Sequence, residues 1–195
     1  RNNIPERIQA RKCNRIPVNE RYFENIDTED KAYWLGFIAG DGCVDKKHET
    51  LTLDLGIIDK DHLQLFLNCI ESDHIIRTRN RVNKVTGNAY QTCCVAIYRA
   101  PLIDDLIKHG VGPNKSKELS ISPTIPKELI SHFIRGIVDS DGCWTLNKYN
   151  TLCFSIVSSV LSFSNELQKI LMNECDLNQT VISATYNNKA YTFAY

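Results

Sequence analysis

The sequence predicts an α+β fold made of two similar halves, and two observations support this prediction. A ten-residue stretch occurs twice, at 34–43 and at 134–143, so that its copies are one hundred residues apart. Each copy is followed by alternating apolar and polar residues, which is typical of a half-buried β-strand. Helical and strand-like patterns therefore recur in the same order, as expected for a duplicated protein.

The two repeated stretches are predicted to be helices that pack against each other. In each copy bulky apolar residues lie at i, i+3 and i+4, which forms one face of a helix. They are Trp34, Phe37 and Ile38 in the first copy and Ile134, Ile137 and Val138 in the second. Small residues form a second row that would let two backbones approach closely. They are Gly36 and Gly40 in the first copy and Gly136 and Ser140 in the second.

Both predicted helices end in Asp-Gly. Gly42 and Gly142 suit the left-handed residue that closes many helices. Asp41 and Asp141 then lie in the last turn, where the helix dipole already concentrates negative charge. Two such carboxylates would repel each other if the helices lie side by side. A divalent cation with hard oxygen ligands, magnesium or calcium, would relieve this repulsion.

The two stretches resemble the LAGLIDADG motif of homing endonucleases, with the motif read at 34–42 and 134–142. The resemblance implies two pseudo-symmetric αββαββα repeats packed through the two motif helices, with antiparallel sheets forming a DNA-binding saddle. It also implies a monomer that binds Mg²⁺, with Mn²⁺ or Ca²⁺ able to substitute in binding, and cleaves both strands of a long asymmetric DNA target. One departure is Ala39, where the second copy keeps the first acid of the motif as Asp139. Asp139 is therefore predicted to be a hydrogen-bonding residue at the helix end rather than an essential ligand.

The resemblance also implies a set of catalytic and metal-binding residues. Asp41 and Asp141 would each bind metal, with the backbone carbonyls of Gly40 and Ser140 as further oxygen ligands. Lys115 corresponds to a lysine that reaches the cleavage pocket, where a cation could neutralise charge developing on the phosphate. Lys115 could equally be a solvent-exposed lysine of a linker.

Four segments are predicted along the chain. Residues 1–23 are a basic N-terminal arm or a solvated linker, 24–112 form the first repeat, 113–125 connect the repeats, and 126–195 form the second repeat. Pro126 is expected at the first position of the second motif helix. The second repeat has no counterpart to the last helix of the first, so it is expected to be incomplete at its C-terminal end.

Hairpins and helices are predicted from periodicity and from turn residues. In the first half we expect strands at 43–47 and 50–55, a helix at 60–70, a hairpin of 76–81 with 90–99 turning at 86–88, and a helix at 100–109. In the second half we expect a strand at 151–156, a helix at 160–172, and a hairpin of 180–186 with 190–195 turning at 187–188.

A basic strand is the predicted DNA-binding element. Arg77, Arg79 and Arg81 share one face because alternate residues of a strand point the same way. A two-stranded ribbon fits the major groove, where Arg pairs with guanine and residues such as Gln91 or Thr52 read base edges. A solvated strand face is the alternative. The other residues predicted to bind DNA are Asp54, Lys46, Lys84, Lys148 and Ser155.

Charge distribution matters more here than the total, because the formal net charge is zero and DNA-binding domains are usually basic. Residues 74–117 contain eight Lys or Arg against two acids, and residues 1–23 contain six against two. Phosphate contact depends on local potential, so these clusters are compatible with nucleic-acid binding.

The eight cysteines show no C-x-x-C spacing, and several lie within apolar patterns. They are predicted to be reduced and buried in a soluble intracellular protein, with cytoplasmic, phage-encoded and organellar origins not distinguished. No apolar run reaches the length of a membrane span. Three functions remain open: a site-specific homing endonuclease, a maturase that binds intron RNA, and a DNA-binding protein of this fold that does not cleave.

Overall fold

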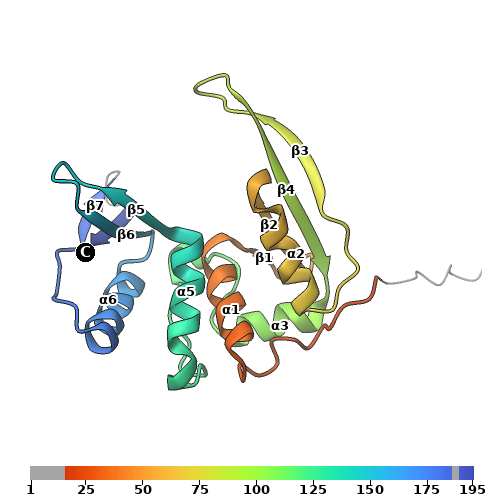
Figure 1. Ribbon diagram of the computed structural model, residues 1–195. Helices are drawn as coiled ribbons and strands as arrows, with labels where there is room; N and C mark the ends of the chain where they lie inside the picture. The colour runs from red at the N-terminus through yellow and green to blue at the C-terminus, as the bar shows by residue number, and fades with distance from the viewer. Residues whose placement is uncertain (1–15, 186–188) are drawn as a thin grey trace, which may run out of the picture.

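The computed structural model describes residues 16–185 and 189–195 and shows a mixed fold of helices and strands in two repeats (Figure 1). The first repeat contains α1 (Glu29–Asp41), β1 (Cys43–Asp45), β2 (Thr50–Gly56), the 3-10 turn η1 (Ile57–Asp59), α2 (Lys60–Cys69), β3 (Arg77–Val82), β4 (Ala89–Tyr98) and α3 (Ala100–Lys108). After the short helix α4 (Lys115–Glu118), the second repeat contains η2 (Lys127–Leu129), α5 (Ile130–Asp141), β5 (Gly142–Leu146), β6 (Leu152–Ser158), α6 (Leu161–Cys175), β7 (Ser183–Thr185) and β8 (Ala190–Ala194). The first repeat thus follows the predicted αββαββα order, and the second follows it through its last strand. The turn predicted at 187–188 lies in the segment that is not described.

Each repeat builds one four-stranded antiparallel sheet. The strand orders are β1-β2-β4-β3 and β5-β6-β8-β7, so the two sheets have the same topology. The sheets lie on opposite sides of the central helices α1 and α5, and the long β3–β4 hairpin projects beyond the helices (Figure 1). The predicted duplicated α+β architecture is confirmed.

The helices α1 and α5 pack closely in a parallel arrangement, as the rows of small residues predicted. A Cβ atom built on Gly36 would lie 2.0 Å from the carbonyl oxygen of Phe133. A Cβ atom on Gly136 would lie 2.1 Å from the carbonyl oxygen of Tyr33. No side chain fits at either position, so glycine is required by the contact between the two backbones.

The glycines after the two helices correct one prediction. Gly42 has φ −73° and ψ 147°, and Gly142 has φ −81° and ψ 150°, so neither residue is left-handed. Both are required for space instead. A Cβ atom on Gly42 would lie 2.5 Å from a methyl carbon of Ile38, and one on Gly142 would lie 2.3 Å from the carbonyl oxygen of Val138. The chain therefore leaves each helix in an extended conformation that passes close to the helix it has just left.

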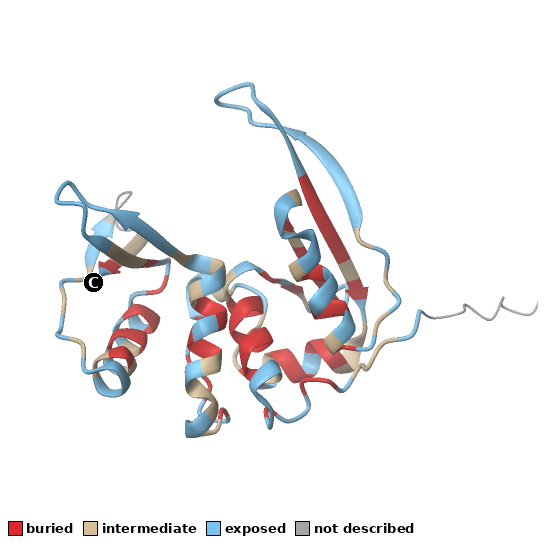
Figure 2. Cartoon of the chain, in the orientation of Figure 1, coloured by how far each residue is buried: buried red, intermediate tan, exposed pale blue. Residues whose placement is uncertain are grey.

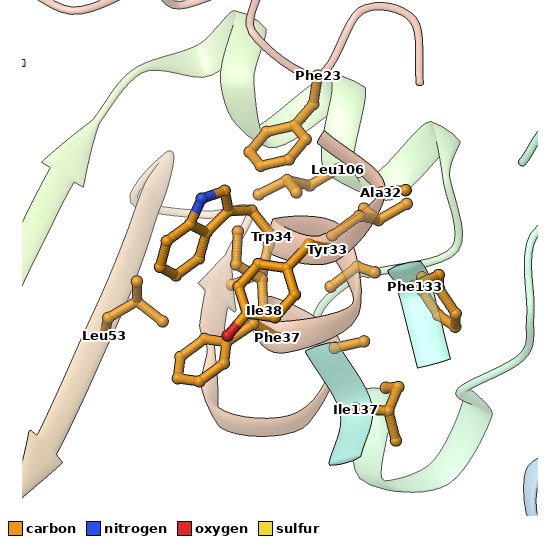
Figure 3. Close-up of a cluster of buried hydrophobic side chains, with 14 of the residues drawn as sticks. Phe23, Ala32, Tyr33, Trp34, Phe37, Ile38, Leu53, Leu106, Phe133 and Ile137 are labelled. Carbon is orange, nitrogen blue, oxygen red and sulfur yellow. The ribbon is translucent and has the colours of Figure 1, made fainter. Parts of the chain in front are cut away.

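A continuous hydrophobic core surrounds α1 and reaches into both repeats (Figure 2). Figure 3 shows Trp34 lying between Phe23, Leu106 of α3 and Leu53 of β2. Tyr22 and Phe23 are both buried. The predicted N-terminal arm therefore ends earlier than residue 23, because these two aromatic residues belong to the core of the first repeat. Residues 1–15 of that arm lie outside the described part of the chain.

The connection between the repeats is more structured than a solvated linker. It contains α4, and Leu119, Ile121 and Ile125 are buried in the common core. Pro126 precedes the turn η2, and α5 begins only at Ile130. The prediction that Pro126 is the first residue of the helix is therefore wrong by one short turn.

The cysteines correct a further prediction. Cys93 and Cys94 are buried, but Cys43, Cys143 and Cys175 are exposed. Those three lie at or just after the end of a helix, where side chains reach solvent. Within the described residues, no helix is both long and apolar enough to cross a membrane.

Candidate functional site

The C-terminal ends of α1 and α5 bring the two motif aspartates together. A Cβ atom on Gly40 would lie 1.9 Å from Oγ of Ser140 and 3.2 Å from Oδ2 of Asp141. Ser140 donates its hydroxyl proton to helix carbonyl oxygens, that of Gly136 at 3.0 Å and that of Ile137 at 3.1 Å. These contacts place Asp41 and Asp141, the last residues of their helices, on either side of the helix interface.

Negative charge is poorly compensated at these helix ends. The pKa of Asp141 is raised to about 6, first by burial and then by the charge of Asp41, while Lys115 opposes both effects. Burial also raises the pKa of Asp41, which Lys115 opposes and Asp59 reinforces. The free protein therefore holds more carboxylate charge at this point than it can neutralise.

Lys115 lies in the site, because α4 directs its side chain toward the end of α1. Its ammonium group donates to the carbonyl oxygens of Ile38 at 3.0 Å and Ala39 at 2.9 Å, and also to that of Gly40. The carbonyl oxygen of Ile38 also accepts from the amide of Gly42 at 2.9 Å, and all three carbonyls lie at the negative end of the helix dipole. Burial lowers the pKa of Lys115 to about 8, while Asp141 and Asp41 act in the opposite direction. The residue is therefore no solvent-exposed linker lysine.

A polar pocket of about 310 Å³ opens on the first-repeat side of the helix pair, lined in part by Asp41, Asp59, His62 and Asp139. The hydroxyl of Tyr33 donates to Oδ2 of Asp139 at 2.8 Å and lies 3.0 Å from Nε2 of His62. Since the single hydroxyl proton goes to Asp139, Nε2 of His62 is the donor to the Tyr33 oxygen. This hydrogen bond agrees with the role predicted for Asp139.

The pocket on the second-repeat side is different, and has a volume of about 340 Å³. Asp141, Lys115, Ser158 and Ser159 are among its lining residues. The two aspartates thus have unlike neighbours, a lysine on one side and a histidine on the other. Sequence reasoning missed His62 and Asp59. Their position at the start of α2, immediately after a strand that ends beside the motif helices, is the signal that could have located them.

The donors at the helix ends fit a divalent cation that takes part of its coordination shell from elsewhere. Among the described residues, no group of three or more His, Cys, Asp or Glu side chains could hold a metal ion. The protein offers the carboxylates of Asp41 and Asp141 and nearby backbone carbonyls, which are hard oxygen donors. Mg²⁺ is commonly held by one or two carboxylates together with waters and phosphate oxygens, so this donor set suits it.

The arginines of β3 lie together on one exposed face of the first sheet. Asp54 of β2 shares this face, and its Oδ2 lies 3.5 Å from Nη1 of Arg79 and also pairs with Arg81. Nε of Arg81 donates to Oγ1 of Thr92 at 3.3 Å. The repulsion expected between neighbouring guanidiniums is thus reduced by a carboxylate of the protein itself, while Arg77 is also exposed.

Two residues predicted to bind DNA lie elsewhere. Gln91 is paired with Asn80 across the ribbon and donates to Oδ1 of that residue at 2.8 Å. Since side chains alternate along a strand, Gln91 points to the face opposite the arginines. Lys46 pairs with Asp104 of α3, so its side chain is directed toward the helical side of the sheet. Both residues therefore lie away from the arginine face, and their contact with DNA stays a prediction.

The remaining predicted contacts are distributed over both repeats. Thr52 shares the face of Asp54, since the two are separated by one residue of β2. Lys84 lies in the exposed β3–β4 turn, and Ser155 is paired with Cys143 and Ala194 in the second sheet. The ammonium of Lys148 lies 4.9 Å from the centre of the Tyr149 ring.

The paired motif helices, the two four-stranded sheets and the acidic helix ends define the two-repeat LAGLIDADG fold. Among solved structures, the homing endonuclease I-WcaI bound to its DNA recognition sequence matches with a TM-score of 0.64 and 18% identity, over 89% of this chain and 80% of that one. Full-length DUF199/WhiA from Thermatoga maritima matches with a TM-score of 0.55 and 18% identity, over 89% of this chain and 56% of that one. I-SmaMI bound to uncleaved DNA target in the presence of calcium ions matches with a TM-score of 0.50 and 12% identity, over 84% and 78%.

These likenesses establish the fold. No protein-family model and no curated protein matches the chain.

Proposed function

We propose that this protein is a site-specific DNA endonuclease of the homing type that acts as a monomer on a long asymmetric target. The observation that carries the proposal is the meeting of Asp41 and Asp141 at adjacent helix ends, beside the half-buried Lys115. The likeness to I-WcaI, a homing endonuclease bound to its DNA recognition sequence, supports it. The two aspartates have different neighbours, His62 in one pocket and Lys115 in the other. This difference between the repeats favours an asymmetric target.

Asp41 and Asp141 would hold Mg²⁺, with the carbonyl oxygens of Gly40 and Ser140 as further donors. When bound, a divalent cation activates water and stabilises negative charge on the phosphate and the leaving oxygen. Lys115 would place a positive charge near the phosphate in a pocket where solvent screens it only partly. The protein itself would orient the DNA backbone and exclude bulk water from these groups.

The exposed arginine face of the first sheet would bind one half of the target. Arg77, Arg79 and Arg81 can reach phosphates and guanine edges when the β3–β4 ribbon enters the major groove. Asp54 would hold the guanidiniums of Arg79 and Arg81 in position before DNA binds. Some of these ion pairs would break when the arginines contact DNA. In the second sheet, Ser155 and the turn residue Lys148 would provide the matching contacts more weakly.

Cleavage of a library of long duplexes in the presence of Mg²⁺ tests the proposal. We expect double-strand breaks at a defined site, and we expect Asp41→Asn and Asp141→Asn each to abolish them while DNA binding remains. Asp73→Asn changes an exposed loop carboxylate and should leave cleavage intact. Loss of cleavage in the Asp73 variant as well would show that the effect of the motif variants is not local.

A DNA-binding protein that does not cleave is the second candidate function. One observation favours it: the ammonium of Lys115 already contacts the carbonyl oxygen of Gly40, which a bound cation would need. Binding of a defined duplex without cleavage, in Mg²⁺ or Mn²⁺, would establish this function instead. Preference for structured intron RNA over DNA in the same assay would indicate a maturase.

A further inference from the structure

A chain of hydrogen bonds lies in the pocket that contains Asp41. Nε2 of His62 donates to the hydroxyl oxygen of Tyr33 at 3.0 Å, and that hydroxyl donates to Oδ2 of Asp139 at 2.8 Å. A neutral imidazole that donates from Nε2 keeps a lone pair on Nδ1. Nδ1 of His62 has no hydrogen-bond partner among the described residues, and it is not a fully buried atom. The pocket therefore holds an accessible proton acceptor near Asp41.

Aromatic contacts fix the orientation of this imidazole ring. The ring centres of Trp34 and Phe37 each lie 4.8 Å from the ring centre of His62. Both residues belong to α1, as does Tyr33 (Figure 3). Packing against α1 and the hydrogen bond to Tyr33 together restrict the ring, so the position of Nδ1 is set before any DNA binds.

The environment of His62 suits a group that accepts a proton. Burial lowers the pKa of His62, while the charges of Asp139 and Asp59 act in the opposite direction. The imidazole is therefore uncharged at neutral pH and has a lone pair to offer. Once it gains a proton, the carboxylates of Asp139 and Asp59 stabilise the resulting cation.

The equivalent positions on the second-repeat side carry apolar residues. Residues of the motif helices have their counterparts one hundred positions away, and His62 is the third residue of α2 as Phe163 is the third residue of α6. The counterparts of Tyr33, His62 and Asp139 are, in that order, Phe133, Phe163 and Ala39. Three hydrogen-bonding groups thus occur together on one side and are replaced together on the other. This pattern indicates a function that only one of the two sides performs.

We propose that His62 is a catalytic residue for only one of the two DNA strands, an inference that rests on the proposed endonuclease function. Nδ1 accepts a proton from the water that attacks phosphorus beside Asp41. The bond between that water oxygen and phosphorus forms, the bond from phosphorus to the leaving oxygen breaks, and the leaving oxygen takes a proton from solvent. Tyr33 and Asp139 are positioning residues that keep the proton of the neutral imidazole on Nε2. The other strand is cut on the side of Lys115, without a histidine.

Cleavage measured separately on each strand tests the proposal, with a cognate duplex that carries a different label on each strand. His62→Phe keeps an aromatic ring against Trp34 and Phe37 and removes both nitrogens. Removal of a general base costs about 100-fold or more in rate, so cutting of one strand should slow by about that factor. The other strand should be cut at nearly the native rate, and nicked duplex should accumulate.

Matched variants separate a chemical role from a structural one. Added imidazole should restore much of the lost rate on the affected strand in His62→Ala, which it could not do for a folding defect. Tyr33→Phe should slow the same strand several-fold, because the ring is then less well oriented. His132→Ala, near the N-terminal end of α5, should leave both rates unchanged.

Nitrogen-15 NMR of the metal-free protein gives a readout that does not depend on cleavage. The signals of His62 are those that His62→Phe removes. At neutral pH they should show a single uncharged form with the proton on Nε2. A proton on Nδ1 instead would overturn the inference, because no lone pair would then be available at that atom.

Failure of this inference can be told apart from failure of the proposed function. A native protein that binds its duplex and cuts neither strand would refute the endonuclease proposal, and this inference with it. If the native protein cuts both strands, and His62→Phe slows both equally or neither, only the inference about His62 is overturned.

Discussion

The charge of Asp141 destabilises the folded protein when no cation is bound. Its carboxyl lies at a helix C-terminus beside Asp41, and both burial and that neighbour raise its pKa to about 6. The last turn of a helix favours cations, so an acid there opposes the helix dipole. A residue that destabilises the fold in this way is expected where function requires it.

We predict that Asp141→Asn stabilises the protein when divalent cations are removed. In the folded state the carboxyl loses its proton only near pH 6, whereas the unfolded chain loses it near pH 4. Stability of the native protein therefore falls as the pH rises between these values. The variant should be more stable by about 1 kcal/mol at pH 7, because the side chain is only partly buried and solvent screens much of the effect.

Thermal unfolding at pH 4 and pH 7 in a chelating buffer measures this effect. The difference between variant and native protein should nearly vanish at pH 4, where the carboxyl is mostly protonated in the folded state. Asp73→Asn, on an exposed loop, should show no such dependence. A variant less stable than the native protein at pH 7 would contradict the electrostatic argument.

At the same scale, Arg79 distinguishes a groove contact from a solvated charge. Arg79→Ala should reduce the affinity for the cognate duplex by about 1 to 3 kcal/mol and relax the preference at one base position. Its neighbour Asn80 lies on the opposite face, so Asn80→Ala should change the affinity little. Fluorescence anisotropy with single-base variants of the duplex gives both quantities. Equal losses for the two variants would argue against a specific contact.

At the scale of elements, the α1–α5 pair holds the repeats together and aligns the two aspartates. Tyr33 of α1 also reaches α5, where it donates to Asp139 and lies under the guanidinium of Arg135 at 4.7 Å from its ring centre. The backbones approach so closely that Gly36 and Gly136 leave no room for a side chain. The relative position of the acids thus depends on two glycines that carry no functional side chain themselves.

We predict that Gly136→Ala strongly destabilises the fold. Its new methyl group would lie 2.1 Å from the carbonyl oxygen of Tyr33, and the helices would have to separate. Overpacking of this kind costs about 1 to 3 kcal/mol. Gly112→Ala is the control, since its Cβ would lie 3.7 Å from the nearest side chain. Urea denaturation of both variants provides the measurement, and a neutral Gly136→Ala would refute the close packing.

At the scale of the whole molecule, two sheets of the same topology differ in charge. The first sheet carries a row of arginines on β3, whereas the described strands of the second sheet carry neither Lys nor Arg. The side pockets at the helix ends differ as well. Binding of a duplex should therefore depend more on the first repeat than on the second.

The salt dependence of DNA binding tests whether the first repeat contributes more to binding than the second. The combined replacement of Arg77, Arg79 and Arg81 by Ala should reduce the slope of log K against log salt by about 0.9 for each phosphate contact that is lost. Lys148→Ala should reduce the slope less. Lys127→Ala, near the N-terminal end of α5, should not change it. Equal slopes for the native protein and the triple variant would show that the arginine face does not contact phosphates.

Local patterns in the sequence predicted the motif helices, most strands and the pairing of α1 with α5. This succeeded because helical and strand periodicities are properties of short segments, and because the requirement for small residues at a close contact is visible in the same segments. Once the two helices were assigned, the position of Asp41 and Asp141 in their last turns followed directly.

The tertiary structure alone decided which distant groups meet. Lys115 reaches the carbonyl oxygens of α1 across 75 to 77 residues of sequence, and His62 and Asp139 share a pocket although they come from different repeats. The face on which Gln91 lies depends on the exact strand register, because a shift of one residue exchanges the two faces. The sequence thus determined the repeated elements and the paired acids, whereas packing determined their neighbours, since contacts between remote segments leave no periodic signal along the chain.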